Sequence, residues 1–414
     1  MAGKLFEFSP YIVAFLLYPI LASFVLRTPS ESRWRLLAAL NILASFVVVL
    51  ALYSAHLYFV PIGTFIGYLV HTAAAFGLYV GFTLICRLAM IRSIDINGPI
   101  VVLAYLLPVS MLPVFLHGAN HRLVIELVGV SYLSLRLCQL VSEVRNGTVV
   151  PPSTARYLAF AFHVPIIFVG PITPYETFQD SVERFSGRSI SSRIAVLRMV
   201  VGAVKFFFLS AVLGGITYGA AFLSDGNQHS WLDLALAVLV YPLYLYCNFS
   251  GLCDLAIGAS ALCGISVMEN FDRPFSARNF QEFWSRWHIS LSKFMRDLVF
   301  TPTVKALTRR MSAAALPAAT AIGILTVFLL IGAWHGLKPN FILFGISQGF
   351  GVLFIFLGGR FLKWRLSKAA YVAYMRHPGW RVVGIAATYL YFSLTMFLFA
   401  NSFEDARAVL AHLR

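Results

Sequence analysis

The sequence contains little charge: only 12% of its 414 residues are Asp, Glu, Lys or Arg, whereas 59% are hydrophobic. An ordinary soluble domain carries about 25% charged residues, so the composition excludes a soluble fold. Apolar runs of about 18 residues or more recur along the chain, and each can cross a hydrocarbon core of about 30 Å as a helix. The composition therefore predicts a single all-α polytopic membrane domain over residues 1–414.

Cysteine is also scarce, and its pattern argues against disulfides and metal. The five cysteines form an odd number, lack CxxC spacing and lie mostly within apolar runs. We interpret them as small hydrophobic side chains, and we predict no metal site and no bound cofactor. Other patterns missing from the sequence are GxSxG of serine hydrolases, HExxH of zinc proteases, the GxxxxGK[ST] and GxGxxG nucleotide loops, and HxxxxD of one acyltransferase class.

Hydropathy predicts about twelve candidate membrane spans. Prolines and glycines interrupt several of them, for example at residues 170–171 and 214–215, which predicts broken or re-entrant segments that are shielded from lipid. The candidate spans lie near residues 10–26, 36–60, 62–91, 99–116, 122–142, 157–171, 194–223, 231–247, 252–268, 314–334, 340–360 and 381–401.

The net charge of +15 suggests nucleic-acid binding in a soluble protein, but the membrane explains it better here. Basic residues cluster between the apolar runs, as is typical of cytoplasmic loops and of contact with anionic headgroups. Arg27, Arg33 and Arg35 follow the first run, which favours an amino terminus outside the cell. We expect the basic segment 360–381 to be cytoplasmic, and we predict no nucleic-acid partner.

The segment 269–310 is rich in charge and aromatic residues although it lies between apolar spans. A helix beginning near Asn279 would place Glu282 and Arg286 four residues apart, where they can pair. One interpretation is an interfacial amphipathic helix whose histidine is satisfied by hydrogen bonds, and the other is a functional histidine. The face that carries this histidine comprises Trp284, His288, Leu291 and Met295.

A second histidine, His335, ends a long apolar run in the sequence IGAWHGLKPN. A histidine near membrane depth is costly and is a functional candidate by default. The following Gly336 also favours a simpler interpretation, in which His335 lies at a helix end and interacts with the terminal carbonyl groups. Local sequence alone leaves both interpretations open.

Several ordered motifs together resemble the membrane-bound O-acyltransferase (MBOAT) family. The motifs cover most of residues 129–350 in the family's order. They are GVSYLSLRLCQLVSEVRNG, GPITPYETF, NFSGLCDLAIGASALCGIS, MENFDRPFSARNFQEFWSRWHISLSKFMRD and AWHGLKPNFILFGISQG.

The resemblance implies a ring of about eleven transmembrane helices, with re-entrant and interfacial helices, around a funnel or tunnel. It implies that His335 is the catalytic histidine and that His288 is a second motif histidine, which positions or gates the donor. A histidine with a pKa of about 6.5 can accept a hydroxyl proton during attack on a thioester.

The resemblance also implies a substrate and donor tunnel. Cationic side chains of the tunnel would meet an anionic donor, a phosphopantetheine thioester on an acyl carrier protein or acyl-CoA, although contact with lipid headgroups explains these cations equally well. The residues assigned to the tunnel are Trp284, Trp287, Trp334, Arg286, Lys293, Arg296, Asn248 and Asp254. From its residue context, Asp254 is either a buried hydrogen-bond acceptor or a carboxylate near a helix N-terminus.

Two bacterial branches of the family fit the motifs: one alanylates teichoic acids and one acetylates secreted polysaccharides such as alginate. The stretch DLVFTPTVKALTRR resembles the first branch, and SGLCDLAIGASALCGISVMENF the second. We therefore predict acyl transfer to an envelope or secreted polymer in the bacterial cytoplasmic membrane, together with a membrane-anchored or extracytoplasmic acyltransferase partner. The alternative is a transporter or flippase that uses intramembrane histidines.

Overall fold

The computed structural model is all-helical and describes most of the chain. Its contacts divide the chain into a first unit, residues 1–203 and 252–268, and a second unit, residues 204–251 and 269–414. No β-strand occurs within the part of the chain that the structure describes. The described residues are 11–55, 65–95, 99–109, 130–167, 170–185, 192–218, 222, 228–310 and 315–413.

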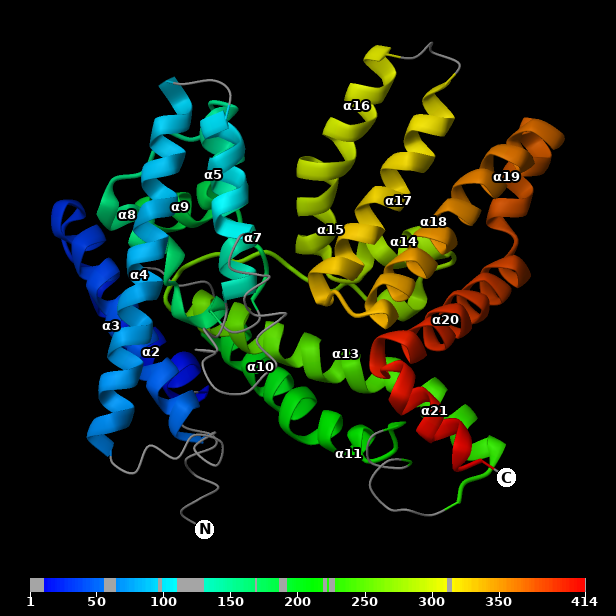
Figure 1. The fold of residues 1–414 in the computed structure, drawn as a ribbon, viewed down its shortest axis with the longest axis horizontal. Helices are drawn as coiled ribbons and strands as arrows, with labels where there is room; N and C mark the ends of the chain where they lie inside the picture. The colour runs from blue at the N-terminus through cyan, green and yellow to red at the C-terminus, as the bar shows by residue number, and fades with distance from the viewer. Residues whose placement is uncertain are drawn as a thin grey trace. The chain divides into compact units, whose positions relative to one another are not determined.

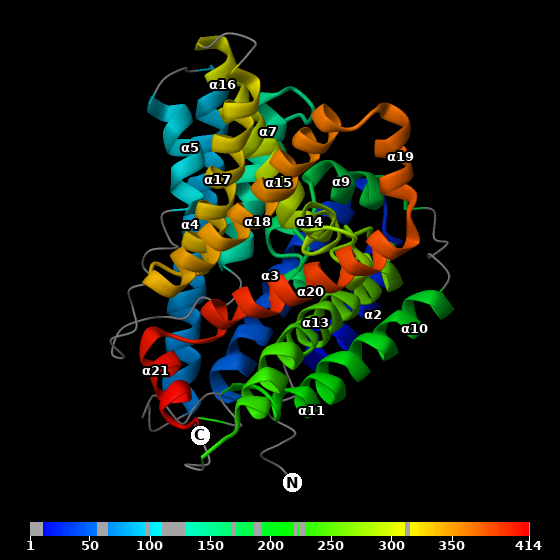
Figure 2. The same ribbon diagram turned by 90° about the vertical axis from the view of Figure 1, so that its right-hand side faces the viewer.

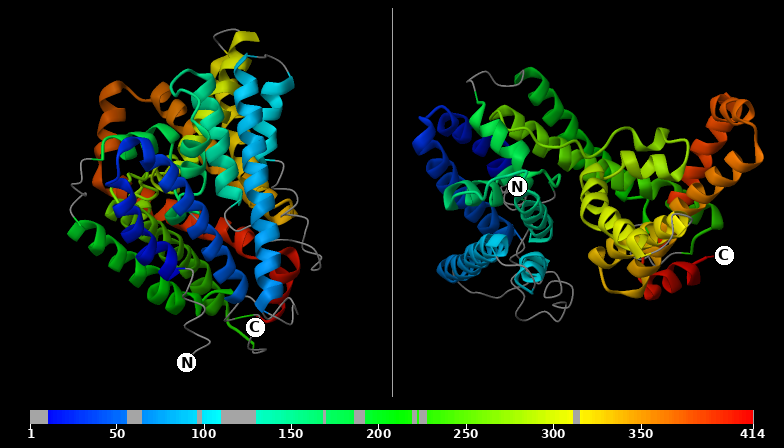
Figure 3. Two further views of the ribbon diagram at one scale, coloured as in Figure 1. Left: turned by 90° about the vertical axis from the view of Figure 1, so that its left-hand side faces the viewer. Right: turned by 90° about the horizontal axis from the view of Figure 1, so that it is seen from above.

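In the first unit, α3 and α4 lie side by side, and α3 also packs against α8 (Figures 1 and 3). α5 packs against both α4 and α7. The helices of this unit are η1 (Val13–Leu17), α2 (Tyr18–Leu26), α3 (Ser30–Ala55), α4 (Phe65–Asp95), α5 (Pro99–Val109), α7 (Val130–Arg145), α8 (Thr154–Ala161), η2 (Val164–Ile166), α9 (Tyr175–Glu183) and α10 (Ser192–Ala203).

In the second unit, α17 packs along α18, and α18 packs against α20 (Figure 2). The helix α13 (Trp231–Leu262) contributes its first part to this unit and its last part to the first unit. The other helices are η3 (Val204–Leu209), α11 (Ser210–Gly214), η4 (Pro274–Ser276), α14 (Phe280–Arg286), α15 (Ile289–Met295), η5 (Arg296–Phe300), α16 (Thr301–Arg310), α17 (Leu316–His335), α18 (Pro339–Arg365), α19 (Lys368–Arg376), α20 (Pro378–Ala400) and α21 (Phe403–Ala411).

Seven helical stretches of the described residues are long and apolar enough to cross a membrane. They confirm a polytopic helical membrane protein, whereas the predicted count of about eleven spans and the funnel stay predictions. Residues 110–129, which hold parts of two predicted spans, lie outside the described residues. The seven stretches are Ser32–Ala51, Thr72–Ile94, Ser192–Gly214, Trp231–Leu262, Leu316–His335, Pro339–Arg365 and Pro378–Ala400.

The prediction of two separate spans at 231–247 and 252–268 is wrong, because both belong mainly to the continuous helix α13. Pro242 lies inside this helix without ending it, as is tolerated where neighbouring groups satisfy the freed carbonyl. The two glycines Gly251 and Gly258 do not interrupt the helix either. One helix of 32 residues therefore replaces two predicted spans.

The predicted span at 157–171 is also wrong, because α8 ends at Ala161 and a short 3-10 turn follows it. His163 adopts an extended backbone, and Pro165 lies in the first turn of the 3-10 segment. Proline removes a backbone donor and disfavours a helical residue before it, so the α-helix cannot continue.

Glycines allow α17 and α18 to approach closely. A Cβ atom at Gly332 would lie 2.5 Å from the carbonyl oxygen of Phe341, and one at Gly345 would lie 2.4 Å from that of Phe328. Both distances are shorter than atoms tolerate, so only glycine fits at these two positions. The close packing fixes the end of α17, where His335 lies.

Candidate active site

His288 lies at a break between two short helices. Asn279 caps the start of α14 by accepting a hydrogen bond from the Glu282 backbone at 2.8 Å, which confirms the predicted helix start. The single helix predicted beyond that point is wrong, because α14 ends at Arg286 and α15 begins at Ile289. His288 has a φ of +47°, a left-handed conformation that is uncommon for residues other than glycine. Strain of this kind clusters at functional sites.

The side chain of Asn270 anchors this break. Its Oδ1 accepts hydrogen bonds from the backbone N–H of Ser290 at 3.2 Å and from the Ser290 hydroxyl at 2.9 Å. Because the Ser290 N–H donates to this atom of Asn270, the atom must be the amide oxygen, which only accepts hydrogen bonds. His288 Nδ1, which lies 3.1 Å from the same oxygen, must therefore carry the proton and donate it to Asn270. Nε2 of His288 is then the nitrogen with the lone pair.

Aromatic rings surround His288, which is only 4% exposed. The Phe249 ring of α13 meets it edge-on at a centroid distance of 4.8 Å, and the Trp334 ring lies 6.3 Å away. Burial lowers the pKa of His288 from 6.5 to about 3, and the nearby His335 adds to this lowering. Because a buried imidazolium lacks hydration, His288 is neutral at physiological pH.

His335 is the last residue of α17, which agrees with the interpretation of a histidine at a helix end. Gly336 leaves the helix with an extended backbone, and Pro339 begins α18. The His335 ring lies 4.7 Å from the Trp334 ring, and the Phe399 ring of α20 meets it edge-on at 5.0 Å. Trp334 therefore contacts both motif histidines, and these rings form an aromatic environment around both imidazoles.

The three predicted tunnel tryptophans belong to this part of the second unit, but they have different surroundings. Trp284 is buried against Phe328 of α17 at 5.0 Å, and its Nε1 has no hydrogen-bond partner among the residues that the structure describes. Trp287 packs against Phe283 and Phe392 at 5.6 and 5.2 Å. The ring of Trp334 is tilted by 59° against each of the two histidine rings, at 6.3 Å from His288 and 4.7 Å from His335.

Two of the three predicted donor-binding cations have acidic partners. Arg286 pairs with Glu282 at 2.8 Å, which confirms the predicted pair, and its side chain also donates to Ser276 Oγ at 3.3 Å. Arg296 is exposed and pairs with Asp297 at 3.0 Å. Lys293 lies half-buried on α15. The arginines thus have structural contacts, and a role toward the donor stays a prediction.

Asn248 and Asp254 both lie on α13 but belong to different units. Asn248 is half-buried and directly precedes Phe249, which contacts His288. Asp254 pairs with Arg198 of α10 at 3.0 Å within the first unit. The prediction of a helix N-terminal carboxylate is wrong for Asp254, because α13 begins more than five turns earlier, at Trp231.

Sequence reasoning missed Asn270, Phe249 and Phe399 as site residues. Asn270 lies within the quoted motif that begins MENFDRPF, and its place in that motif was the available signal. Phe249 and Phe399 are single phenylalanines among 37, and no local pattern distinguishes them. Only the packing of α13 and α20 in the second unit brings them to the histidines.

The model of the MBOAT, membrane-bound O-acyltransferase family matches residues 79–400. This chain belongs to that family. The match includes both histidines of the site and every residue predicted for the tunnel.

Relatives of this MBOAT chain are named for acyl transfer to teichoic acid, alginate and peptidoglycan. It is 31% identical over 253 residues to a teichoic acid D-alanyltransferase of Bacillus subtilis, a match that covers 57% of this chain and 63% of the relative. It is 30% identical over 228 residues to a probable alginate O-acetylase of Azotobacter vinelandii, covering 54% and 43%. A peptidoglycan O-acetyltransferase of Helicobacter pylori is 28% identical over 198 residues, covering 47% and 36%. The chain thus spans less than two thirds of these relatives' length.

Proposed function

We propose that this protein transfers an acyl group from a thioester to a hydroxyl of a cell-envelope or secreted polymer. The observation that carries the proposal is the placement of His335 at the end of a membrane helix, within an aromatic environment shared with His288, in a chain of the MBOAT family. Relatives named for D-alanylation and for O-acetylation support both acyl groups, so the proposal covers the reaction class. The proposed location is the bacterial cytoplasmic membrane.

His335 acts as the general base in this proposal. Its imidazole takes the proton of the acceptor hydroxyl as the oxygen attacks the thioester carbonyl, so that a C–O bond forms and the C–S bond breaks. The proton then passes to the departing thiolate, which leaves as a thiol. The transfer needs no covalent enzyme intermediate.

His288 is the positioning residue of the proposal. Asn270 and the helix break hold its ring in one orientation, with Nδ1 as the donor to Asn270. Trp334 contacts both histidine rings and therefore couples their positions. Because burial keeps the His288 imidazole neutral, His288 adds no positive charge beside the proposed base, His335.

The proposed donor is a phosphopantetheine thioester on an acyl carrier protein or on coenzyme A. Lys293 on α15 is the cation that we expect to meet its phosphate, since Arg286 and Arg296 already have carboxylate partners. The proposed partners are this carrier and a membrane-anchored or extracytoplasmic acyltransferase that completes delivery to the polymer.

The test compares ester-linked acyl groups, by mass spectrometry, on the envelope polymers of a deletion strain. The strain is complemented with wild type, His335→Ala or the control His377→Asn at matched membrane levels. His377 is an exposed helix cap, and asparagine caps equally well. An ester restored by wild type and His377→Asn alone supports the proposal, and its mass identifies the acyl group. An ester restored by His335→Ala refutes the assigned base, and no ester in any strain refutes the reaction.

A further inference from the structure

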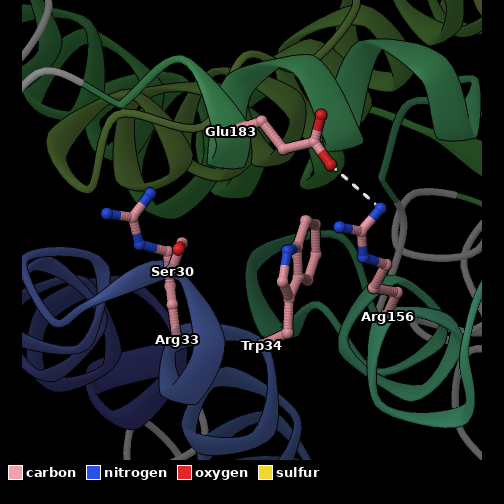
Figure 4. Close-up of a pocket in the computed structure, with 5 residues that line it drawn as sticks. All are labelled: Ser30, Arg33, Trp34, Arg156 and Glu183. Atoms are coloured by element: carbon pink, nitrogen blue, oxygen red, sulfur yellow. Dashed lines mark ion pairs between the residues drawn. The ribbon is translucent and has the colours of Figure 1, made fainter.

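A cavity of about 370 Å³ with three charged side chains in its lining belongs to the first unit and includes none of the residues of the proposed reaction (Figure 4). The start of α3, the first turn of α8 and the last residue of α9 line it. Two arginines and one carboxylate give the lining one positive charge in excess. The lining residues are Ser30, Arg33, Trp34, Arg156 and Glu183.

The two arginines are held in place around an aromatic ring. Arg156 Nη1 pairs with Glu183 at 2.9 Å, and its guanidinium carbon lies 5.1 Å from the centroid of the Trp34 ring. Arg33 donates to the backbone carbonyl of Val182 at 2.9 Å and to that of Thr28 at 3.1 and 3.2 Å. Figure 4 shows the two guanidinium groups on opposite sides of the Trp34 ring.

Donors remain for a ligand at this cavity. A guanidinium carries five N–H donors, and the backbone contacts of Arg33 use three of them. These contacts orient Arg33 without neutralising its charge. The planar guanidinium is well suited to pair with two oxygens of a phosphate.

The position of the cavity at the start of a membrane-crossing helix fits the depth of lipid headgroups. The membrane-crossing stretch of α3 begins at Ser32, so Arg33 and Trp34 belong to its first turn and Ser30 lies just before it. Tryptophan is enriched at this boundary because one part of its ring is apolar and its N–H is polar. Basic pockets beside membrane helices bind anionic headgroups.

We propose that this cavity binds the phosphodiester of an anionic glycerophospholipid. A single negative charge balances the excess of the lining, whereas a zwitterionic headgroup brings no net charge. The phosphate oxygens meet the free donors of Arg33 and Arg156, and the glycerol carbons pack on Trp34. This inference does not depend on the acyl transfer proposed above.

Native mass spectrometry of the full chain in detergent tests the proposal with phosphatidylglycerol and phosphatidylcholine as probes. We expect Arg156→Gln to retain about tenfold less phosphatidylglycerol than wild type, because one charged donor is lost at a partly exposed site. The control is Arg35→Gln, which removes an exposed arginine of α3 that lies outside the cavity. Equal retention by Arg156→Gln and Arg35→Gln overturns the proposal.

The variant Glu183→Gln tests whether Arg156 binds the lipid phosphate or only forms a structural ion pair with Glu183. Removing this carboxylate frees Arg156 and raises the positive charge, so retention of phosphatidylglycerol should rise. A structural salt bridge predicts a loss from both variants. A site for a zwitterionic headgroup predicts that wild type retains phosphatidylcholine and that Glu183→Gln retains less of it, because the cationic group loses its carboxylate. Either result overturns the proposal. The Glu183→Gln measurement tests the proposal even if Arg156→Gln fails to fold. If millimolar inorganic phosphate displaces phosphatidylglycerol, the natural ligand is free phosphate and the lipid proposal is wrong. If phosphatidylglycerol stays bound, the result supports a lipid ligand.

Discussion

Two histidines, one in each unit, show how differently the same side chain can be used. His163 follows α8 in the first unit, and the structure places both of its ring nitrogens against hydroxyl groups, the Tyr18 Oη and the Ser260 Oγ, each at 3.0 Å. His335 ends α17 in the second unit, and aromatic rings surround it. Both lie near apolar sequence, so sequence context alone does not separate them.

The hydrogen bonds around His163 form a fully assigned chain. Asn41 donates to the Ala159 carbonyl at 2.6 Å, which identifies its other amide atom as the oxygen that accepts the Tyr18 hydroxyl at 2.8 Å. The Tyr18 oxygen then accepts from His163 Nδ1, and Nε2 accepts from the Ser260 hydroxyl. Such a chain specifies a packing arrangement, because every polar group depends on the others.

The comparison teaches that hydrogen-bond surroundings distinguish a structural histidine from a candidate base. An imidazole whose two nitrogens are both engaged has no lone pair for a substrate, as with His163. An imidazole held by aromatic packing can offer a nitrogen to a hydroxyl, as we propose for His335. The predictions below test this difference.

Replacing His335 should have the largest effect. We expect His335→Ala to lower the rate of acyl transfer by about 10²–10⁴-fold, the usual contribution of a general base. The midpoint of thermal unfolding should stay close to that of wild type, since the ring makes mainly aromatic contacts. The measurement is thiol release from the thioester by purified protein in nanodiscs. If His335→Ala keeps the wild-type turnover, His335 is not the general base.

Asn270→Ala should have the next largest effect on activity. Losing the amide oxygen frees the His288 ring and leaves the buried Ser290 backbone N–H without its acceptor. We expect kcat to fall by about tenfold to a hundredfold because the histidine is misplaced, with KM changed less. Asn270→Asp keeps an acceptor oxygen and should restore part of kcat. A loss of stability without any change in kcat would assign Asn270 to folding alone.

Tyr18→Phe tests the structural side of the comparison. The variant removes the hydroxyl that joins Asn41 to His163 and leaves both polar groups buried without it. We expect the free energy of unfolding to fall by about 1–3 kcal/mol, with kcat per folded molecule unchanged. Denaturant titration together with the thiol assay measures both. A specific loss of kcat would give the His163 network a catalytic role.

The burial of His288 predicts a pH dependence of stability. Its pKa is lowered to about 3 in the folded protein, whereas the unfolded chain binds the proton near pH 6.5. The stabilising contribution is therefore fully present above pH 6.5 and is lost as the pH falls toward 3. His288→Gln should flatten the fall in the unfolding midpoint over this range, measured by differential scanning fluorimetry. An unchanged slope would place the responsible group elsewhere.

Glu282→Gln should have the smallest effect. Its pair with Arg286 is four residues apart and partly exposed, and such pairs contribute at most about 1 kcal/mol. The free energy of unfolding should change within that limit, and acyl transfer should persist. A large loss of transfer in this variant would show that Arg286 acts on the donor through its orientation.

Short-range chemistry in the sequence determined several features that the structure confirms. The composition excludes a soluble fold, Asn279 caps α14, Glu282 pairs with Arg286, and the glycine after His335 ends α17. The first depends on the composition of the whole chain, and the other three depend on residues within about four positions of one another, so no long-range contact is needed to predict them.

Tertiary packing decided the remaining features. Nothing in the residues around His288 requires a left-handed backbone there, and the break exists because Asn270, 18 residues earlier, holds Ser290 and the ring. Likewise, α13 stays continuous through two glycines and a proline despite their low helix propensity. The aromatic environment of His335 needs Phe399 from another helix. Sequence identified the histidines, whereas long-range contacts decided which groups surround each of them, because burial depends on residues far apart in the chain.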